Sequence, residues 1–181
     1  MARVNLIDPA SANASVQPTL DQIKGAFGVV PNMFKAVANS QAALQSMWGS
    51  FGALGGGTIG AKLGEQIAVA VADRNACNYC LAAHTVLGQK AGASAAEMAE
   101  SQAGRSADPQ TEAALRFAIK VVENRGAMTA ADVQALRAAG FDDEAIVEIL
   151  AHVALNLFTN YVNVAFDVPV DFPAVKLTRA A

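Results

Sequence analysis

Residues 65–84 read EQIAVAVADRNACNYCLAAH, an apolar run followed by a polar break and two cysteines. Helix-forming residues dominate this stretch and most of the chain, and β-branched residues rarely alternate with polar ones, which argues against a sheet. The break at Asp73-Arg74-Asn75 offers a new helix cap. We therefore predict one helix from about residue 59 to 72 and a second from Cys77 to about Lys90.

Turn and capping signals divide the rest of the chain into further helices. Gly28-Val29-Val30-Pro31 separates the first two, and Gly55-Gly56-Gly57 ends the third. Ser94-Ala95-Ala96-Glu97 has the form of a capping box, and Asp142-Asp143-Glu144 places negative charge at the start of a long last helix. The expected helices span about 19–27, 32–38, 41–53, 95–101, 109–124, 129–138 and 142–165.

These elements make all-α the expected fold class. We predict a single all-α domain at residues 19–167, an N-terminal arm at 1–18 and an extended C-terminal tail at 168–181, because the two ends show no sustained periodicity. With 181 residues and 53% hydrophobic composition, the chain has enough apolar material for a core without disulfide bonds.

Charge and hydropathy exclude several classes of partner. The formal net charge is −3 and the basic residues are scattered, so we expect no nucleic-acid surface and no anionic-membrane surface. The N-terminus has no continuous apolar segment typical of a secretory signal, and no apolar run approaches the ~18 residues that a spanning helix needs. The protein is therefore predicted to be soluble and cytoplasmic.

The only two cysteines, Cys77 and Cys80, are followed by His84. If all three lie on one helix, they fall within a strip about 60° wide, and residues three apart have Cβ atoms about 5–6 Å apart. A modest adjustment would then allow a disulfide. We favour a redox pair over a metal site or an inert structural role, because a closed zinc site needs four ligands and only His152 and carboxylates remain to complete it.

Two effects compete over which sulfur attacks a substrate. With Asn75 as the helix cap, Cys77 would lie in the first turn, where the helix dipole stabilises an anion. Cys80 lies one turn from His84, and a directly bonded imidazole activates a thiol further than the dipole does. We favour Cys80 as the nucleophile and Cys77 as the resolving thiol.

Glu65 can act on His84 only if the chain bends between the two residues. On one straight helix, Glu65 would lie about 22 Å from Cys80 and about 28 Å from His84. A turn near Asp73-Arg74-Asn75 would fold its helix back against the cysteine helix, and the carboxylate would then fix the tautomer of His84. A Glu65 farther than one water molecule from both residues would have no such role.

The spacing of Glu65, Cys77, Cys80 and His84 resembles that of the alkyl hydroperoxidase D (AhpD) family, within the carboxymuconolactone decarboxylase superfamily. The similarity covers about residues 40–120. Three further motifs resemble a longer, peroxidase-related branch: Gly28-Val29-Val30-Pro31-Asn32-Met33-Phe34, Asn160-Tyr161-Val162-Asn163 and Asp171-Phe172-Pro173.

The resemblance implies an AhpD-like helical fold with the CxxC at the start of a central helix, assembled into trimers or hexamers. It also implies a peroxiredoxin-type activity, in which Cys80 attacks a hydroperoxide, Cys77 resolves the sulfenic acid, and Glu65 and His84 relay a proton. An external dithiol or thiol protein then restores the enzyme, and no metal, flavin or nicotinamide cofactor is implied. Tyr79 departs from the pattern, since the best-known members have a second histidine there.

A polar line crosses the last expected helix: Glu148, His152, Asn156 and Asn160 repeat every four residues. These groups are either core residues with hydrogen-bond partners or the wall of a pocket opposite the cysteines, to which Tyr79 would also belong. Our hypothesis is a thiol-dependent peroxidase. A general disulfide oxidoreductase and a non-enzymatic redox-sensing interaction protein are the alternatives.

Overall fold

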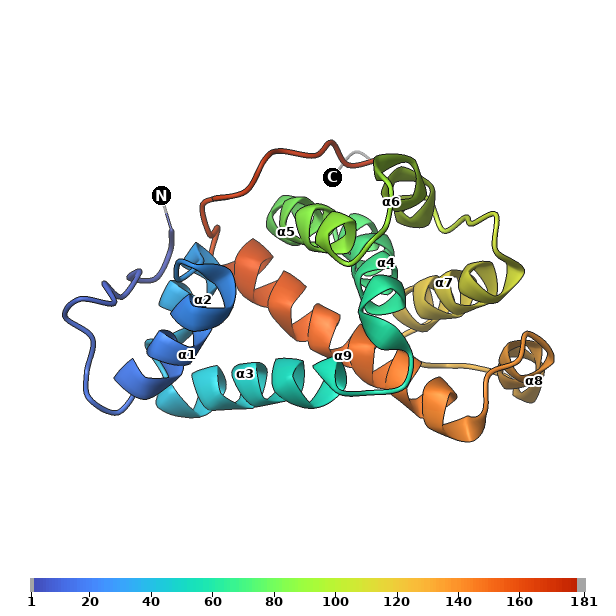
Figure 1. Ribbon diagram of the computed structural model, residues 1–181, viewed down its shortest axis with the longest axis horizontal. Helices are drawn as coiled ribbons and strands as arrows, with labels where there is room; N and C mark the ends of the chain where they lie inside the picture. The colour runs from blue at the N-terminus through green and yellow to red at the C-terminus, as the bar shows by residue number, and fades with distance from the viewer. Residues whose placement is uncertain (1, 179–181) are drawn as a thin grey trace.

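The structure is a computed structural model that describes residues 2–178, and this part of the chain is helical without strands (Figure 1). The expected all-α fold class is confirmed, and each expected helix has a counterpart. The helices of the described residues are α1 (Gln17–Phe27), α2 (Asn32–Val37), α3 (Gln41–Gly55), α4 (Gly60–Arg74), α5 (Asn78–Lys90), α6 (Ala95–Gln102), α7 (Pro109–Glu123), α8 (Ala130–Ala138) and α9 (Asp143–Ala165).

Helix α4 lies at the centre of the protein and packs against α5, α6, α7 and α9. Every residue of its apolar run from Ile67 to Asp73 is buried. Gly88 lets α5 come close, because a Cβ atom there would meet the side chain of Met98 and lie 3.3 Å from the Cβ of Glu65. The apolar run identified in the sequence thus forms the buried helix against which the cysteine helix α5 packs.

The reversal between α4 and α5 takes three residues. Asn75 ends α4, and Ala76 has a left-handed backbone with φ of 51°. The backbone N–H of Cys77 donates to Ala72 O at 2.9 Å, and that of Ala76 donates to Asp73 O at 3.2 Å, which is the hydrogen-bond pattern of a Schellman motif. The bend expected at residues 73–75 is therefore present, one residue later than predicted.

Two hydrophobic clusters flank α4 and α5. The first joins α1, α2, α3 and α5 and includes both cysteines, with Leu20, Phe34 and Met47 among its fully covered side chains. The second joins α4, α7, α8 and α9 around Ile67 and Leu115. The cysteines therefore belong to the cluster built with the N-terminal helices.

Helix α9 runs diagonally beneath α4 and α5 (Figure 1) and packs against α3, α4, α5 and α7. It is 23 residues long, and its most apolar window has a mean hydropathy of 1.4, so by length and composition it could cross a membrane. From the sequence we expected no apolar run of about 18 residues, and α9 meets the length and mean-hydropathy criteria although His152, Asn156 and Asn160 interrupt it. Half of that window is buried inside the protein, so the core accounts for much of its apolar character.

The C-terminal segment follows α9 as an extended chain that passes over α5 to α6 (Figure 1). Asp171 accepts a hydrogen bond from the backbone N–H of Asn32 at 2.8 Å. Farther along, the buried carboxylate of Asp73 accepts from the Thr178 N–H and from Gln102 Nε2, both at 2.8 Å. Residues 179–181 of the expected tail lie outside the described residues, as does residue 1.

Asp73 should hold the tail through its charge. Burial favours its neutral form, but hydrogen bonds from Gln102 and Thr178 and the charge of Arg74 lower the pKa of Asp73 below its usual value. The stabilisation is therefore present above the unfolded pKa and is lost as the pH falls through the folded pKa.

We expect Asp73→Ala to lower the free energy of unfolding at pH 7 by about 1–3 kcal/mol, because it leaves buried donors unpaired. It should also speed proteolysis near Thr178. The control is Asp143→Ala, which removes an exposed ion pair with Arg137 and should cost about 0.5 kcal/mol or less. Equal losses in denaturant titrations of both variants would contradict this role of Asp73.

Candidate functional site

The two cysteines lie at the beginning of α5 and are buried, with 1% of Cys77 and 2% of Cys80 exposed. Both are free thiols. Cys77 is itself the N-cap, and its Sγ accepts a hydrogen bond from the Cys80 N–H at 3.3 Å. The expectation that Asn75 caps this helix was wrong, because Asn75 ends α4 and its side chain donates to Asn160 Oδ1 at 2.9 Å.

Glu65 and His84 are brought together by the packing of α4 against α5. His84 Nδ1 lies 2.7 Å from Glu65 Oε2, so the distance condition set for Glu65 is met. Because a carboxylate only accepts, the imidazole nitrogen donates this hydrogen bond, which leaves Nε2 for other chemistry. His84 and Cys80 line the same cavity, one helical turn apart on α5.

The surroundings of the cysteine pair place negative charge on Cys80. Burial favours the neutral thiol, but the hydrogen bond from Cys77, the charge of His84 and the hydrogen bond from Asn163 lower the pKa of Cys80 to about 7. The hydrogen bond with Cys80 raises the pKa of Cys77, as do burial and the charge of Cys80. The proton of the pair therefore stays on Cys77.

The helix N-terminus argues for the opposite assignment, because Cys77 is the residue that receives a backbone N–H. We favour charge on Cys80, since three side-chain groups stabilise its anion and a single backbone hydrogen bond serves Cys77. This distribution agrees with the choice of Cys80 as the attacking thiol.

The surroundings of His84 favour its protonated form. Burial opposes its protonation, but the charge of Glu65, the hydrogen bond to Glu65 and the charge of Cys80 raise the pKa of His84 above its usual value. Both shifts favour a thiolate on Cys80 beside an imidazolium on His84, with the Glu65 carboxylate behind it. Such a pair supplies both a nucleophile and a proton donor.

An apolar cavity opens beside Cys80 and His84. Tyr79 also faces it, and the remaining walls come from Phe27, Pro31, Met33, Phe34, Phe51, Ala83, Leu87 and Phe172. It leaves about 30 Å³ for the centres of water-sized molecules. The cavity therefore suits a small or slender substrate with an apolar group.

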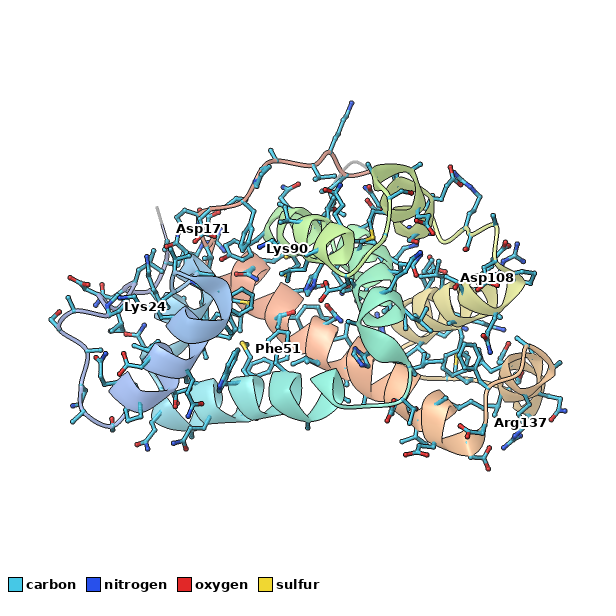
Figure 2. The ribbon with its side chains drawn as sticks, in the orientation of Figure 1. Lys24, Phe51, Lys90, Asp108, Arg137 and Asp171 are labelled. Atoms are coloured by element: carbon cyan, nitrogen blue, oxygen red, sulfur yellow. The ribbon has the colours of Figure 1, made fainter. Side chains whose placement is uncertain are left out.

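A second cavity of about 120 Å³ lies on the Glu65 side of His84 and is lined by Glu65, His152 and Asn156. His84 and Phe51 border both cavities. Phe51 extends from α3 toward the interior of the protein (Figure 2). His84 therefore borders two cavities, of which one is apolar and the other has polar groups in its wall.

His152 lies tight against α4, because a Cβ atom at Gly64 would be 2.9 Å from His152 Cε1. Its Nε2 is buried without a hydrogen-bond partner in the described residues, and burial lowers the pKa of His152 despite the charge of Glu148. The four residues of the polar line on α9 therefore have different surroundings. Glu148 accepts from the Thr58 N–H at 2.6 Å, His152 and Asn156 line the second cavity, and Asn160 lies near Cys80.

Tyr79 lines the apolar cavity and is held by α2 and the C-terminal segment. Its hydroxyl oxygen accepts from the Met33 N–H at 3.2 Å, and its ring meets Phe172 edge-on at 5.7 Å. Burial and the Asp171 carboxylate raise the pKa of Tyr79, so the phenol keeps its proton. Tyr79 therefore joins α2 and the tail to the cysteine helix.

Two residues near Cys80 that the sequence did not identify as part of the site, Thr159 and Asn163, lie on α9. Asn163 Nδ2 donates to Cys80 Sγ at 3.1 Å, and Thr159 Oγ1 lies 4.0 Å from the same sulfur. The available signal was the spacing of Thr159, Asn160 and Asn163 on one face of an apolar helix. Within residues 2–178, no three His, Cys, Asp or Glu side chains are grouped to hold a metal ion.

Glu65→Gln should lower the pKa of His84, because it removes the charge that favours the imidazolium. The loss of that cation should in turn raise the pKa of Cys80. In a pH profile of Cys80 alkylation, the rise near pH 7 should move to higher pH. Glu97→Gln is the control, because Glu97 pairs with Lys62 on the surface. Identical profiles for both variants and the unmodified protein would contradict the coupling.

Comparison with known proteins finds a family that the central part of the chain resembles. Residues 39–124 match the carboxymuconolactone decarboxylase family. This segment includes α4, α5 and all four residues of the Glu65, Cys77, Cys80 and His84 set. No protein in the comparison with curated sequences matches the chain.

Solved structures match over nearly the whole chain. An uncharacterized peroxidase-related protein from Silicibacter sp. TM1040 is 25% identical, with a TM-score of 0.82 over 93% of this chain and 91% of its own. A second, described as an alkylhydroperoxidase AhpD core and an uncharacterized peroxidase-related protein from Ralstonia eutropha JMP134, is 24% identical, with a TM-score of 0.83 over 94% and 92%.

The debrominase Bmp8, solved with 2,3,4-tribromopyrrole, is 18% identical, with a TM-score of 0.78 over 94% of both chains. It shares the fold with this chain. Residues 39–124 are therefore similar to the carboxymuconolactone decarboxylase family, and the chain has an all-helical fold that matches AhpD-like structures.

Proposed function

We propose that the protein is a thiol-dependent peroxidase that reduces hydroperoxides to alcohols and water. The observation that carries the proposal is the arrangement of buried Cys80 and His84 with half-buried Glu65, which favours a thiolate and an imidazolium beside a second thiol. The peroxidase-related descriptions of two proteins with the same fold agree with an oxidoreductase.

The proposed reaction balances with two thiols. The Cys80 thiolate attacks the terminal oxygen of ROOH, the O–O bond breaks, and His84 protonates the departing alkoxide to give ROH. Cys77 then attacks the sulfur of the Cys80 sulfenic acid, which releases water and forms the disulfide. An external dithiol or thiol protein reduces the disulfide by exchange.

Burial of the thiols favours a small substrate over a protein disulfide. With 2% or less of either cysteine exposed, a folded protein surface has no direct contact with the sulfurs. A hydroperoxide with a slender apolar group fits the apolar cavity beside Cys80. The peroxidase is therefore favoured over a general disulfide oxidoreductase, and the reductant is proposed to reach Cys77 through a narrow arm or a local opening.

The proposal includes a homo-oligomer in the cytoplasm, with no nucleic-acid or membrane partner. An exposed apolar stripe on α9 supports self-association, because Val147, Leu150, Phe158, Tyr161 and Val164 are all exposed on that helix. A cytoplasmic location agrees with the chemistry, since a reducing compartment keeps the pair in its dithiol form between turnovers.

Substitution of each cysteine separates their roles. Cys80→Ser should abolish the fast reaction with hydroperoxide, because it removes the nucleophile. Cys77→Ser should still react once and then accumulate a sulfenic acid, because no resolving thiol remains. Stopped-flow oxidation by hydrogen peroxide, tert-butyl hydroperoxide and cumene hydroperoxide, with mass spectrometry of the products, measures both outcomes.

The same experiment distinguishes the alternatives. Reaction of both variants at the rate of an ordinary free thiol would overturn the peroxidase assignment. Oxidation that changes the mass of the assembly without turnover by a dithiol would indicate the redox sensor instead.

The size of the apolar cavity should set the preference among hydroperoxides. Ala83→Leu adds volume to the wall and should slow cumene hydroperoxide about tenfold more than hydrogen peroxide. Leu87→Ala removes volume from the same wall and should favour cumene hydroperoxide, because a bulky group then fits with less displacement. Relative rates that move together for all peroxides in both variants would show that this cavity is not the substrate site.

A further inference from the structure

The Asn163 side chain is held in one orientation at the sulfur of Cys80. Its Nδ2 donates to Thr159 O at 3.0 Å and to Cys80 Sγ at 3.1 Å, which uses both N–H groups. Exchange of the amide oxygen and nitrogen would place two acceptor oxygens against each other at Thr159. The backbone carbonyl therefore fixes the amide with a donor aimed at the sulfur.

This orientation leaves an unpaired acceptor in the core. Asn163 is buried, with 4% exposed, and its Oδ1 has no hydrogen-bond partner in the described residues. Unpaired buried polar atoms are destabilising and are retained mainly where function requires them. A leucine has the same branching of heavy atoms and would leave no unpaired acceptor, so helix formation by α9 does not explain an asparagine here.

We propose, on the basis of the peroxidase function above, that Asn163 is a further catalytic residue whose amide N–H stabilises the Cys80 thiolate. A hydrogen bond to a charged acceptor is roughly twice as strong as one between neutral groups, so this donor favours the anion over the thiol. Asn163 and His84 stabilise the same sulfur from different helices, α9 and α5. The thiolate therefore does not depend on the imidazolium alone.

The other charged or titratable groups around the sulfur come from elements other than α9. Cys77, Tyr79 and His84 lie on or beside the start of α5, Glu65 acts from α4 through His84, and Asp171 acts from the tail through Tyr79. Four titratable residues of α9 lie eleven or more residues before Asn163, namely Asp143, Glu144, Glu148 and His152, and the fifth, Tyr161, is exposed on the surface. Substitution of Asn163 therefore alters none of these groups directly.

The test compares Asn163→Leu and Asn163→Asp with Asn156→Leu. Asn156 is an equally buried asparagine on the same helix, but its Nδ2 donates to His152 O at 2.9 Å, away from the sulfur. The thiolate is measured by the pH dependence of Cys80 alkylation with iodoacetamide, resolved by mass spectrometry in the full-length protein. This readout requires no peroxide.

Asn163→Leu should raise the apparent pKa of Cys80 by about one unit, a tenfold smaller thiolate fraction below that pKa. It should not lower the midpoint of denaturant unfolding, because it removes an unpaired acceptor. Asn163→Asp should raise the pKa further, since it places a carboxylate against the sulfur. Asn156→Leu should leave the pKa unchanged.

A Cys80 pKa that is unchanged in Asn163→Leu and Asn163→Asp would overturn the inference, as would equal shifts in Asn156→Leu. The rate with tert-butyl hydroperoxide is measured separately. If the pKa shifts as expected but the unmodified protein does not reduce peroxides, the proposed function fails while thiolate stabilisation by Asn163 stands. If peroxides are reduced and the pKa does not move, the proposed function stands and Asn163 has no such role.

Discussion

The hydrogen bond between Glu65 and His84 depends on the way α4 and α5 are joined, and the rest of the site follows from that connection. Glu65 and His84 are nineteen residues apart, and only the reversal at Ala76 lets the two helices lie alongside each other. Cys77 follows the reversal directly. Its N–H closes the Schellman motif at the end of α4, and the same residue is the N-cap of α5. Gly88 then allows the close approach that brings α5 onto Glu65.

The site combines a dry environment with compensating charges. Burial opposes both the thiolate of Cys80 and the imidazolium of His84, and each ion is tolerated because the other lies beside it. The third charged group is Glu65, which accepts a hydrogen bond from His84 and lies in the wall of the second cavity. The low dielectric that makes isolated ions costly also strengthens every hydrogen bond made to them.

Much of the fold and part of the site could be predicted from local patterns. Signals at helix starts such as Ser94 and Asp142, together with glycine and proline breaks, predicted the order of the helices because their effects are confined to a few neighbouring residues. The need for a bend between Glu65 and the cysteines followed from helix geometry alone. The cap of α5 was missed because a left-handed alanine at position 76 has no signature in sequence.

The contribution of α9 could not be obtained in that way. Asn163 is 83 residues from Cys80 in the chain, and its contact depends on how α9 crosses beneath α5. The polar line from Glu148 to Asn160 was visible, but Glu148 binds the turn before α4, His152 and Asn156 line a cavity, and Asn160 lies near the cysteines. Tertiary packing, which periodicity does not encode, decides which asparagine faces the sulfur.

The position of Cys77 as a helix cap links redox state to helix stability. In the dithiol form its sulfur accepts the Cys80 N–H, and loss of a capping interaction costs a helix about 1 kcal/mol. Closing the pair into a disulfide turns that sulfur toward Cys80 Sγ and weakens the cap. For a two-electron couple, this amounts to roughly 20 mV in the reduction potential, in the direction that makes the oxidised form easier to reduce. The same atom that resolves the oxidised sulfur thereby biases the protein toward its reduced resting state.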